Sequence, residues 1–232
     1  MAGGTRSGSL RRLDHEGSEN TSKMSLKTTP DEDSKVIELY DQATSALLTA
    51  AGQQDERLLG HSERVTAYCL AIGEQLGLSP KEMSDLRYAA SLHDIGKIGV
   101  SKSIVNKLGK LSEEELEAMR LHSVIGIRIL EKIEGLKGAL PAIRHHHERW
   151  DGRGYPDGLA GEDIPLGARI IAVAETFDIL TSDVPWRGRI PMVEAVKELR
   201  RCSGSQFDPE IVTVFVDKVL EAPARYKELR AA

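Results

Sequence analysis

The sequence has few cysteines, no excess of basic residues and no long apolar run. Its two cysteines, Cys69 and Cys202, are too few for a disulfide framework. Lys and Arg number 31 against 36 Asp and Glu, a net charge of −5 that argues against a nucleic-acid-binding surface. No apolar run approaches the roughly 18 residues of a membrane span or forms a secretory signal. We therefore expect a cytoplasmic protein that binds neither nucleic acid nor membrane.

The two ends of the chain differ from its middle. Residues 1–33 contain no Val, Ile, Phe, Tyr or Trp and are rich in Ser, Thr, Gly and charge. Such a segment buries too little apolar surface to offset the entropy of ordering it. We predict a disordered tail at 1–33, with no sensor or receiver domain ahead of the main domain. After this tail we predict an N-terminal helix and connection at 34–57, a main domain at 58–222 and a C-terminal tail at 223–232.

The middle of the chain has a helical pattern throughout. Ser79-Pro80-Lys81-Glu82 and Ser112-Glu113-Glu114-Glu115 are capping boxes, which mark helix starts. No alternating run predicts a sheet, so the expected fold is all-α. The stretch 151–165 holds four glycines and two prolines and predicts an ordered loop. The predicted helices span residues 34–52, 58–77, 80–95, 113–133, 137–148, 165–182, 190–202 and 208–221.

Several of these helices place histidines on their apolar faces. A lone inward histidine is usually a core residue bonded to a backbone carbonyl. Several such imidazoles with a carboxylate need a common partner, and a metal cluster provides one. Asp94 could bridge two metals, and Lys97, one turn further on, could neutralise a phosphate oxygen. The candidate residues are His61, His93, Asp94, His122, His146 and His147.

The order of these motifs is similar to that of a known family. His93-Asp94-Ile95-Gly96-Lys97 is followed by the run from His146-His147-Glu148 to Asp151-Gly152-Arg153-Gly154-Tyr155-Pro156. This combination resembles the HD-GYP domain, a branch of the HD metal-dependent phosphohydrolases. The resemblance implies a single HD-type helical bundle at 58–222 with a Gly- and Pro-rich GYP loop.

The resemblance also implies an activity. Members of the family hydrolyse cyclic di-GMP to linear pGpG or GMP with a hydroxide activated by a metal centre. Nitrogen and oxygen ligands without thiolate favour iron, manganese or zinc. The resemblance implies iron or manganese, with zinc, magnesium and nickel as alternatives. Arg57 stands where three-metal members carry a glutamate, so two divalent ions are expected. The GYP loop implies contacts with diguanylate cyclase-type or other signalling proteins.

Carried over residue by residue, the resemblance assigns roles to individual side chains. Asp94 and Lys97 would be catalytic, and Glu148, Asp151 and Asp178 would orient ligands or fix the loop. Lys97, Tyr155, Trp186 and Arg187 would contact the substrate. One metal would be bound by His61, His93, Asp94 and Glu175, and the other by Asp94, His122, His146 and His147.

Three positions depart from the family pattern. Glu175 stands where an aspartate is usual, Val184 replaces an arginine that would contact the nucleotide, and His145 adds an imidazole whose role stays open. These changes leave two alternatives to the phosphodiesterase. One is a weak or inactive module that binds cyclic di-GMP or a partner protein. The other is an HD phosphohydrolase acting on a different nucleotide or cyclic dinucleotide.

Overall fold

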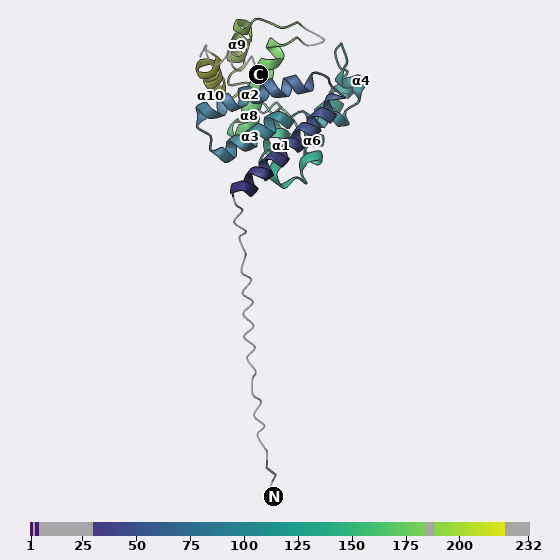
Figure 1. Ribbon diagram of the computed structural model, residues 1–232, viewed down its shortest axis with the longest axis vertical. Helices are drawn as coiled ribbons and strands as arrows, with labels where there is room; N and C mark the ends of the chain where they lie inside the picture. The colour runs from purple at the N-terminus through teal and green to yellow at the C-terminus, as the bar shows by residue number, and fades with distance from the viewer. Residues whose placement is uncertain (2, 5–29, 184–187, 221–232) are drawn as a thin grey trace.

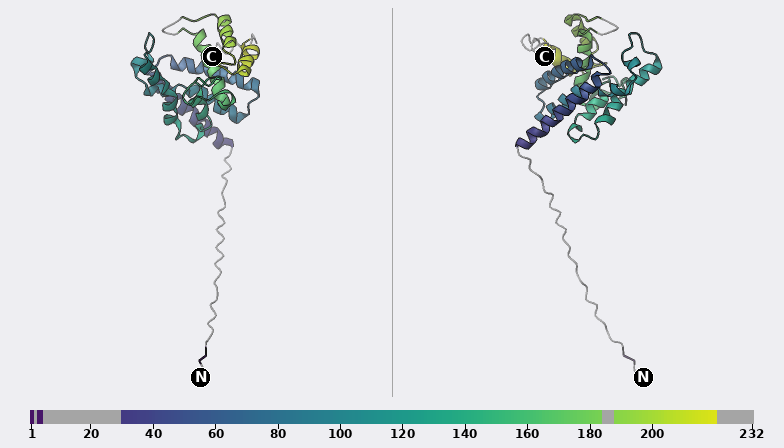
Figure 2. Two further views of the ribbon diagram at one scale, coloured as in Figure 1. Left: turned by 180° about the vertical axis from the view of Figure 1, so that it is seen from behind. Right: turned by 45° about the vertical axis from the view of Figure 1, so that its right-hand side comes forward.

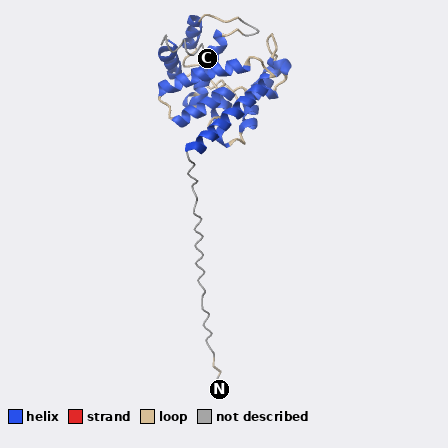
Figure 3. Cartoon of the chain, viewed as in Figure 1, coloured by secondary structure: helices blue, strands red, loops and turns tan. Residues whose placement is uncertain are grey.

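Every regular element in the described part of the chain is a helix. The computed structural model describes residues 30–183 and 188–220, together with residues 1, 3 and 4. Figures 1 and 3 show one bundle of helices without a strand in this part of the chain. The predicted all-α fold is therefore confirmed. Most of the predicted tail at 1–33 and all of that at 223–232 lie outside the described residues.

Ten α-helices and four short helices of other types make up the described part of the chain. Three 3-10 helices are η1 (Ile95–Gly99), η2 (Glu134–Leu136) and η3 (Gly161–Asp163), and η4 (Val214–Leu220) is a π-helix. The α-helices are α1 (Pro30–Gly52), α2 (Leu58–Leu76), α3 (Pro80–Leu92), α4 (Lys102–Val105), α5 (Glu113–Arg120), α6 (His122–Leu130), α7 (Leu140–His145), α8 (Leu166–Thr181), α9 (Met192–Arg201) and α10 (Pro209–Thr213).

Two helices begin where the sequence predicts. Ser79 caps α3 and Ser112 caps α5, each accepting a hydrogen bond from the backbone N–H three residues later. The glutamates Glu82 and Glu115 complete the boxes by accepting from the serine N–H groups at 2.8 and 2.7 Å. Both capping boxes are therefore confirmed.

Other helix boundaries differ from the prediction. The structure starts α1 at Pro30, inside the predicted tail, and divides the predicted helix at 113–133 into α5 and α6. The helices predicted at 80–95 and 137–148 end early, at Leu92 and His145. A histidine stands at the break between α5 and α6 and just after the ends of α3 and α7. In each of these histidines, His122, His93 and His146, the imidazole Nδ1 donates to the carbonyl three residues earlier. Because the side chain takes up that carbonyl, the regular backbone ladder can stop there.

The core lies around α2, which packs against α3, α8 and η4. Tyr68 of α2, Phe177 of α8 and Phe215 of η4 form an edge-to-face triangle with ring centroids 5.2 to 5.7 Å apart. Although aromatic residues make up only 4% of the chain, three of them meet here. α1 lies along the outside of the bundle against α2, α3 and η1 (Figure 2). Within the described residues, no helix has the length and apolarity needed to cross a bilayer.

The segment that carries the HD motif packs directly on α6. Gly96 of η1 approaches the α6 backbone so closely that a Cβ atom there would lie 1.8 Å from the carbonyl oxygen of His122. The same atom would lie 2.6 Å from the backbone nitrogen of Gly126. This contact brings Asp94 and His122 together, and it requires a residue without a side chain.

Replacing Gly96 with alanine should lower the free energy of unfolding by about 1–3 kcal/mol, because the methyl group would push η1 away from α6. Chemical denaturation followed by circular dichroism measures this change. Gly109→Ala is the matched control, since nothing lies within 4 Å of its added Cβ. We expect it to change stability by less than about 0.5 kcal/mol. Equal losses in the two variants would contradict the close-packing argument.

Candidate metal centre

The structure brings all seven predicted metal ligands together in two adjoining groups. In each group, the ligand atoms lie within 4.8 Å of one another. α2 and α8 contribute His61 and Glu175, while the other ligands lie at or beside helix ends. The first group is His61, His93, Asp94 and Glu175, and the second is His122, His146 and His147.

The histidines are oriented by hydrogen bonds on the side away from the groups. The Nδ1 atoms of His93, His122 and His146 donate to the carbonyl oxygens three residues earlier, at 2.8, 2.6 and 2.7 Å. A carbonyl only accepts, so in each neutral ring the proton lies on Nδ1 and the Nε2 lone pair points inward. The Nε2 atoms of His122 and His146 face each other at 3.3 Å. Two lone pairs at that distance need a cation between them or beside them.

Asp94 belongs to the first group, borders the second and is buried, with 1% of its surface exposed. Its Oδ1 is 3.5 Å from His122 Nε2, and its Oδ2 is 3.5 Å from His93 Nε2 and 3.9 Å from His61 Nε2. One carboxylate oxygen therefore faces each group, the arrangement that a bridging ligand needs. Lys97 donates to Oδ2 at 2.5 Å.

The protonation states suit metal ligands. Burial lowers the pKa of His93 to about 4 and is the main cause that lowers the pKa values of His122, His146 and His147. Burial alone would raise the pKa of Asp94, but Lys97 and the surrounding histidines hold it well below its usual value. The site thus presents neutral imidazoles and an ionised carboxylate, the forms in which these groups bind metals.

Glu175 reaches the first group despite the extra methylene that distinguishes it from aspartate. Its carboxylate belongs to the cluster around Asp94, and the residue is 7% exposed. Burial, followed by the charge of Asp94, raises the pKa of Glu175 to about 7. Two carboxylates in one buried group repel each other, so a cation between them would be strongly favoured.

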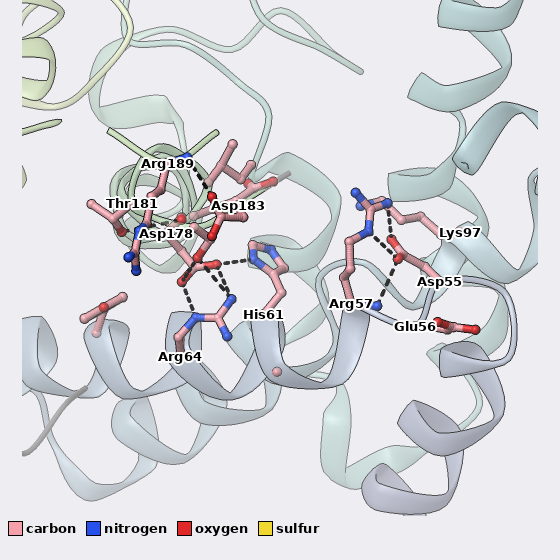
Figure 4. A pocket seen from close by; sticks show the side chains of 15 residues that line it. Asp55, Glu56, Arg57, His61, Arg64, Lys97, Asp178, Thr181, Asp183 and Arg189 are labelled. Atoms are coloured by element: carbon pink, nitrogen blue, oxygen red, sulfur yellow. Dashed lines mark hydrogen bonds and ion pairs between the residues drawn. The ribbon is translucent and has the colours of Figure 1, made fainter. Parts of the chain in front are cut away.

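Asp178 stands behind His61. It accepts from His61 Nδ1 at 2.7 Å, and its two oxygens accept from Arg64 Nε and Nη2 at 2.6 and 3.0 Å (Figure 4). A carboxylate that binds Nδ1 directs the Nε2 lone pair toward the ligand group. Asp178 is therefore placed to orient His61, and Arg64 holds Asp178.

The GYP loop covers the second group. The Tyr155 ring stacks on His147 with centroids 4.9 Å apart. Glu148 is buried, and its Oε1 accepts from the backbone N–H groups of Asp157 and Gly158 at 2.7 and 3.0 Å. A Cβ on Gly154 would lie 2.4 Å from the Glu148 Cα, so the loop folds closely onto the end of α7. Glu148 thus fixes the loop.

Asp151 and His145 also form hydrogen bonds in and next to the GYP loop. Asp151 accepts from Arg149 Nε and Nη2 at 3.0 and 2.8 Å, in a contact with its own turn. The Nε2 atom of His145 is 2.8 Å from Asp157 Oδ2, and its Nδ1 donates to the Pro141 carbonyl. His145, whose role the sequence left open, thus bonds to the loop and belongs to neither ligand group.

Two cavities meet at the centre. One has a volume of about 500 Å³ and is bordered by His61, and the other has about 440 Å³ and is bordered by His122 and His147. Both volumes are in the range of small-molecule sites. The predicted substrate residues Lys97 and Tyr155 border them, whereas Trp186 and Arg187, like Val184, lie outside the described residues. Four residues border both cavities: Asp55, Arg57, Lys97 and Glu175.

Sequence reasoning gave Arg57 no role beyond the metal count, and it missed Arg64 and Asp55. Arg57, the N-cap of α2, and Arg64 lie one helical turn before and after His61, a spacing that could have indicated them. Asp55 precedes α2 in the connection from α1, and its contact with Arg57 has no sequence signal of its own.

The residues present fit divalent metal ions. His93 Nε2 and Asp94 Oδ1 are buried and have no hydrogen-bond partner among the described residues. Unpaired buried polar atoms are costly, and here both point into the ligand groups. Nitrogen and oxygen donors without a thiolate suit iron, manganese or zinc.

Comparisons with known proteins agree with this architecture. Residues 45–211 match the model of the HD domain family. A cyclic di-GMP phosphodiesterase of Thermotoga maritima is 41% identical over 67% of this chain and 43% of its own length. A 3'3'-cGAMP-specific phosphodiesterase of Vibrio cholerae is 36% identical over 83% of this chain and 43% of its own length. The chain thus spans less than half of these curated relatives.

A solved structure has the same fold. The crystal structure of a cyclic GMP-AMP specific phosphodiesterase of Vibrio cholerae matches 80% of this chain and 50% of its own, with a TM-score of 0.61 and 23% identity. The family match over most of the chain and the order of the HD and GYP motifs lead to one conclusion. This chain belongs to the HD domain family, in its HD-GYP branch.

Proposed function

We propose that this chain is a metal-dependent phosphodiesterase that hydrolyses cyclic di-GMP to pGpG, GMP or both. The observation that carries the proposal is the buried Asp94 carboxylate, with one oxygen facing each of the two histidine groups. The Thermotoga maritima relative, named a cyclic di-GMP phosphodiesterase, supports the substrate class. Two cavities that meet at Lys97 and Glu175 leave room for a ligand with two nucleotides.

The site would bind two divalent ions. When bound, such a pair lowers the pKa of a water molecule and polarises a phosphodiester for in-line attack. Iron and manganese remain the preferred ions, with zinc, magnesium and nickel as alternatives. The first ion would be held by His61, His93, Asp94 and Glu175, and the second by Asp94, His122, His146 and His147.

The remaining residues prepare the site for the reaction. Lys97 keeps its ammonium group beside Asp94, is partly exposed and borders both cavities, so it can offset negative charge on the phosphorus oxygens. Asp178 holds His61 in one tautomer, and Tyr155 packs on His147. Tyr155 also borders the second cavity, where its contact with the substrate stays a prediction.

A second candidate substrate is a hybrid cyclic dinucleotide. The Vibrio cholerae relative is named specific for 3'3'-cGAMP, and it aligns with 83% of this chain. Comparing turnover of cyclic di-GMP, 3'3'-cGAMP and cyclic di-AMP separates the two candidates. Contacts with diguanylate cyclases through the GYP loop, and the cytoplasmic location, stay predictions.

Asp94→Ala should abolish hydrolysis of cyclic di-GMP and reduce bound metal, because it removes the carboxylate between the two groups. The assay is chromatography of products from anaerobically purified, iron- or manganese-loaded protein, with metal content measured on the same sample. Asp217→Ala removes an exposed carboxylate paired with Arg200, and it should keep wild-type activity. Product formation by Asp94→Ala at the wild-type rate would contradict the proposal. Wild-type protein that binds metal and cyclic di-GMP without forming product would favour the binding-module alternative.

Glu175→Gln tests whether Glu175, which stands where the family usually has an aspartate, binds metal. Loss of its charge should weaken the first site, lowering the metal content from about two ions to about one. We expect activity to fall about tenfold or more. Elemental analysis and the product assay measure both effects. Glu194→Gln, which alters an exposed carboxylate paired with Lys197, is the control, and an unchanged metal content in Glu175→Gln would exclude the ligand role.

A further inference from the structure

Arg57 lies where the two cavities meet. Among the described residues, it and Lys97 are the two basic side chains that border both cavities. A ligand that occupies both cavities must pass these two cations. Figure 4 shows Arg57 with its partner Asp55 and, in this view, Lys97 on the opposite side of His61 from Asp178 and Arg64.

The two cations differ in what holds them. Lys97 is bonded to Asp94, inside the metal-ligand groups, and so belongs with the reacting phosphodiester. Arg57 belongs to neither group and is bonded instead to Asp55. Arg64, another arginine that borders the first cavity, is bonded to Asp178, the carboxylate that accepts from His61.

Asp55 orients the Arg57 side chain. Arg57 Nε donates to Asp55 Oδ1 at 2.9 Å and Nη2 donates to Oδ2 at 3.2 Å, which is the two-pronged geometry of an arginine–carboxylate pair. The Asp55 side chain is 9% exposed, whereas that of Arg57 is 35% exposed. The carboxylate is thus buried beneath the guanidinium, and the guanidinium reaches the cleft with its orientation already set.

Arg57 is also tied to the centre through the backbone. Its carbonyl accepts from the His61 N–H at 3.0 Å, so the two residues are one turn apart at the start of α2. Residues at this spacing share a helix face. Arg57 therefore keeps a constant separation from the first ligand group, close to it but not part of it.

We propose that Arg57 is a substrate-binding residue. It binds the second, non-reacting phosphate of a cyclic dinucleotide, while Lys97 contacts the reacting phosphate. The inference rests on the proposed function, because it requires a ligand with two phosphates. A guanidinium matches a phosphate with two parallel hydrogen bonds, which a carboxylate-anchored arginine can offer without first being ordered.

The experiment compares Arg57→Gln and Arg57→Lys with the wild type, using the metal-loaded full chain. Arg57→Gln should raise the KM for cyclic di-GMP about tenfold or more and leave kcat within about threefold, the loss expected for one charged hydrogen-bonding group. Arg57→Lys keeps the charge and the Asp55 pair but loses the two-pronged geometry, so an intermediate KM is expected. With bis(4-nitrophenyl) phosphate, which has a single phosphate, the loss should be at least about tenfold smaller than with cyclic di-GMP.

Arg87→Gln is the matched control. Arg87 is also paired with an aspartate, Asp41, at 2.8 Å, its side chain is 36% exposed, and it borders neither cavity. It should leave both activities unchanged. The inference is overturned if Arg57→Gln raises the KM no more than Arg87→Gln does. It is also overturned if Arg57→Gln lowers hydrolysis of both substrates equally, because Arg57 would then act on the metal centre.

Calorimetric binding of cyclic di-GMP to protein without added metal separates this inference from the proposed function. If the wild type binds the nucleotide but forms no product when loaded, and Arg57→Gln weakens binding about tenfold, the phosphate contact stands and the phosphodiesterase proposal fails. If the wild type forms product and Arg57→Gln binds as tightly, the proposed function stands and the role of Arg57 is wrong. If the wild type neither binds nor hydrolyses the nucleotide, both fail.

Discussion

Imidazole lone pairs from α2, the end of α3, the start of α6 and the end of α7 converge on the buried carboxylate of Asp94. Such an arrangement is unfavourable for a protein alone, because the Nε2 atoms of His122 and His146 face each other and His93 Nε2 has no partner among the described residues. Divalent cations would remove that cost and link the helices to one another. The fold buries most of the ligands, and bound metal would in turn stabilise the fold.

Hydrogen bonds from the Nδ1 atoms of the histidines fix the directions of the Nε2 lone pairs. Three histidines stand at or beside helix ends, and each bonds to a carbonyl that the helix leaves without its regular partner. One hydrogen bond thus completes the helix end and sets the tautomer of the ring. His61, inside α2, has no such carbonyl, and the Asp178–Arg64 pair takes its place.

Charge is distributed locally in a way that the net charge of −5 conceals. Asp94 and Glu175 would balance the metals, and Lys97 and Arg57 border the space above them. Each cation is held by its own aspartate, so neither needs to be ordered when an anion arrives. A protein that is acidic overall can therefore present a cleft suited to a phosphodiester.

The helix starts at Ser79 and Ser112 and the all-α class were determined by the sequence alone, because capping and helical periodicity act within a few residues. The sequence also predicted the histidines and Asp94 as metal ligands, whereas Glu175 came from the resemblance to the HD-GYP family. The break between α5 and α6 was not predictable, since apolar periodicity continues across it. Only the tertiary structure decided that Asp178 backs His61, 117 residues away, and that His145 turns to the loop. The place of Arg57 between the cavities was decided there too. These contacts depend on how distant helices pack, which local patterns do not encode.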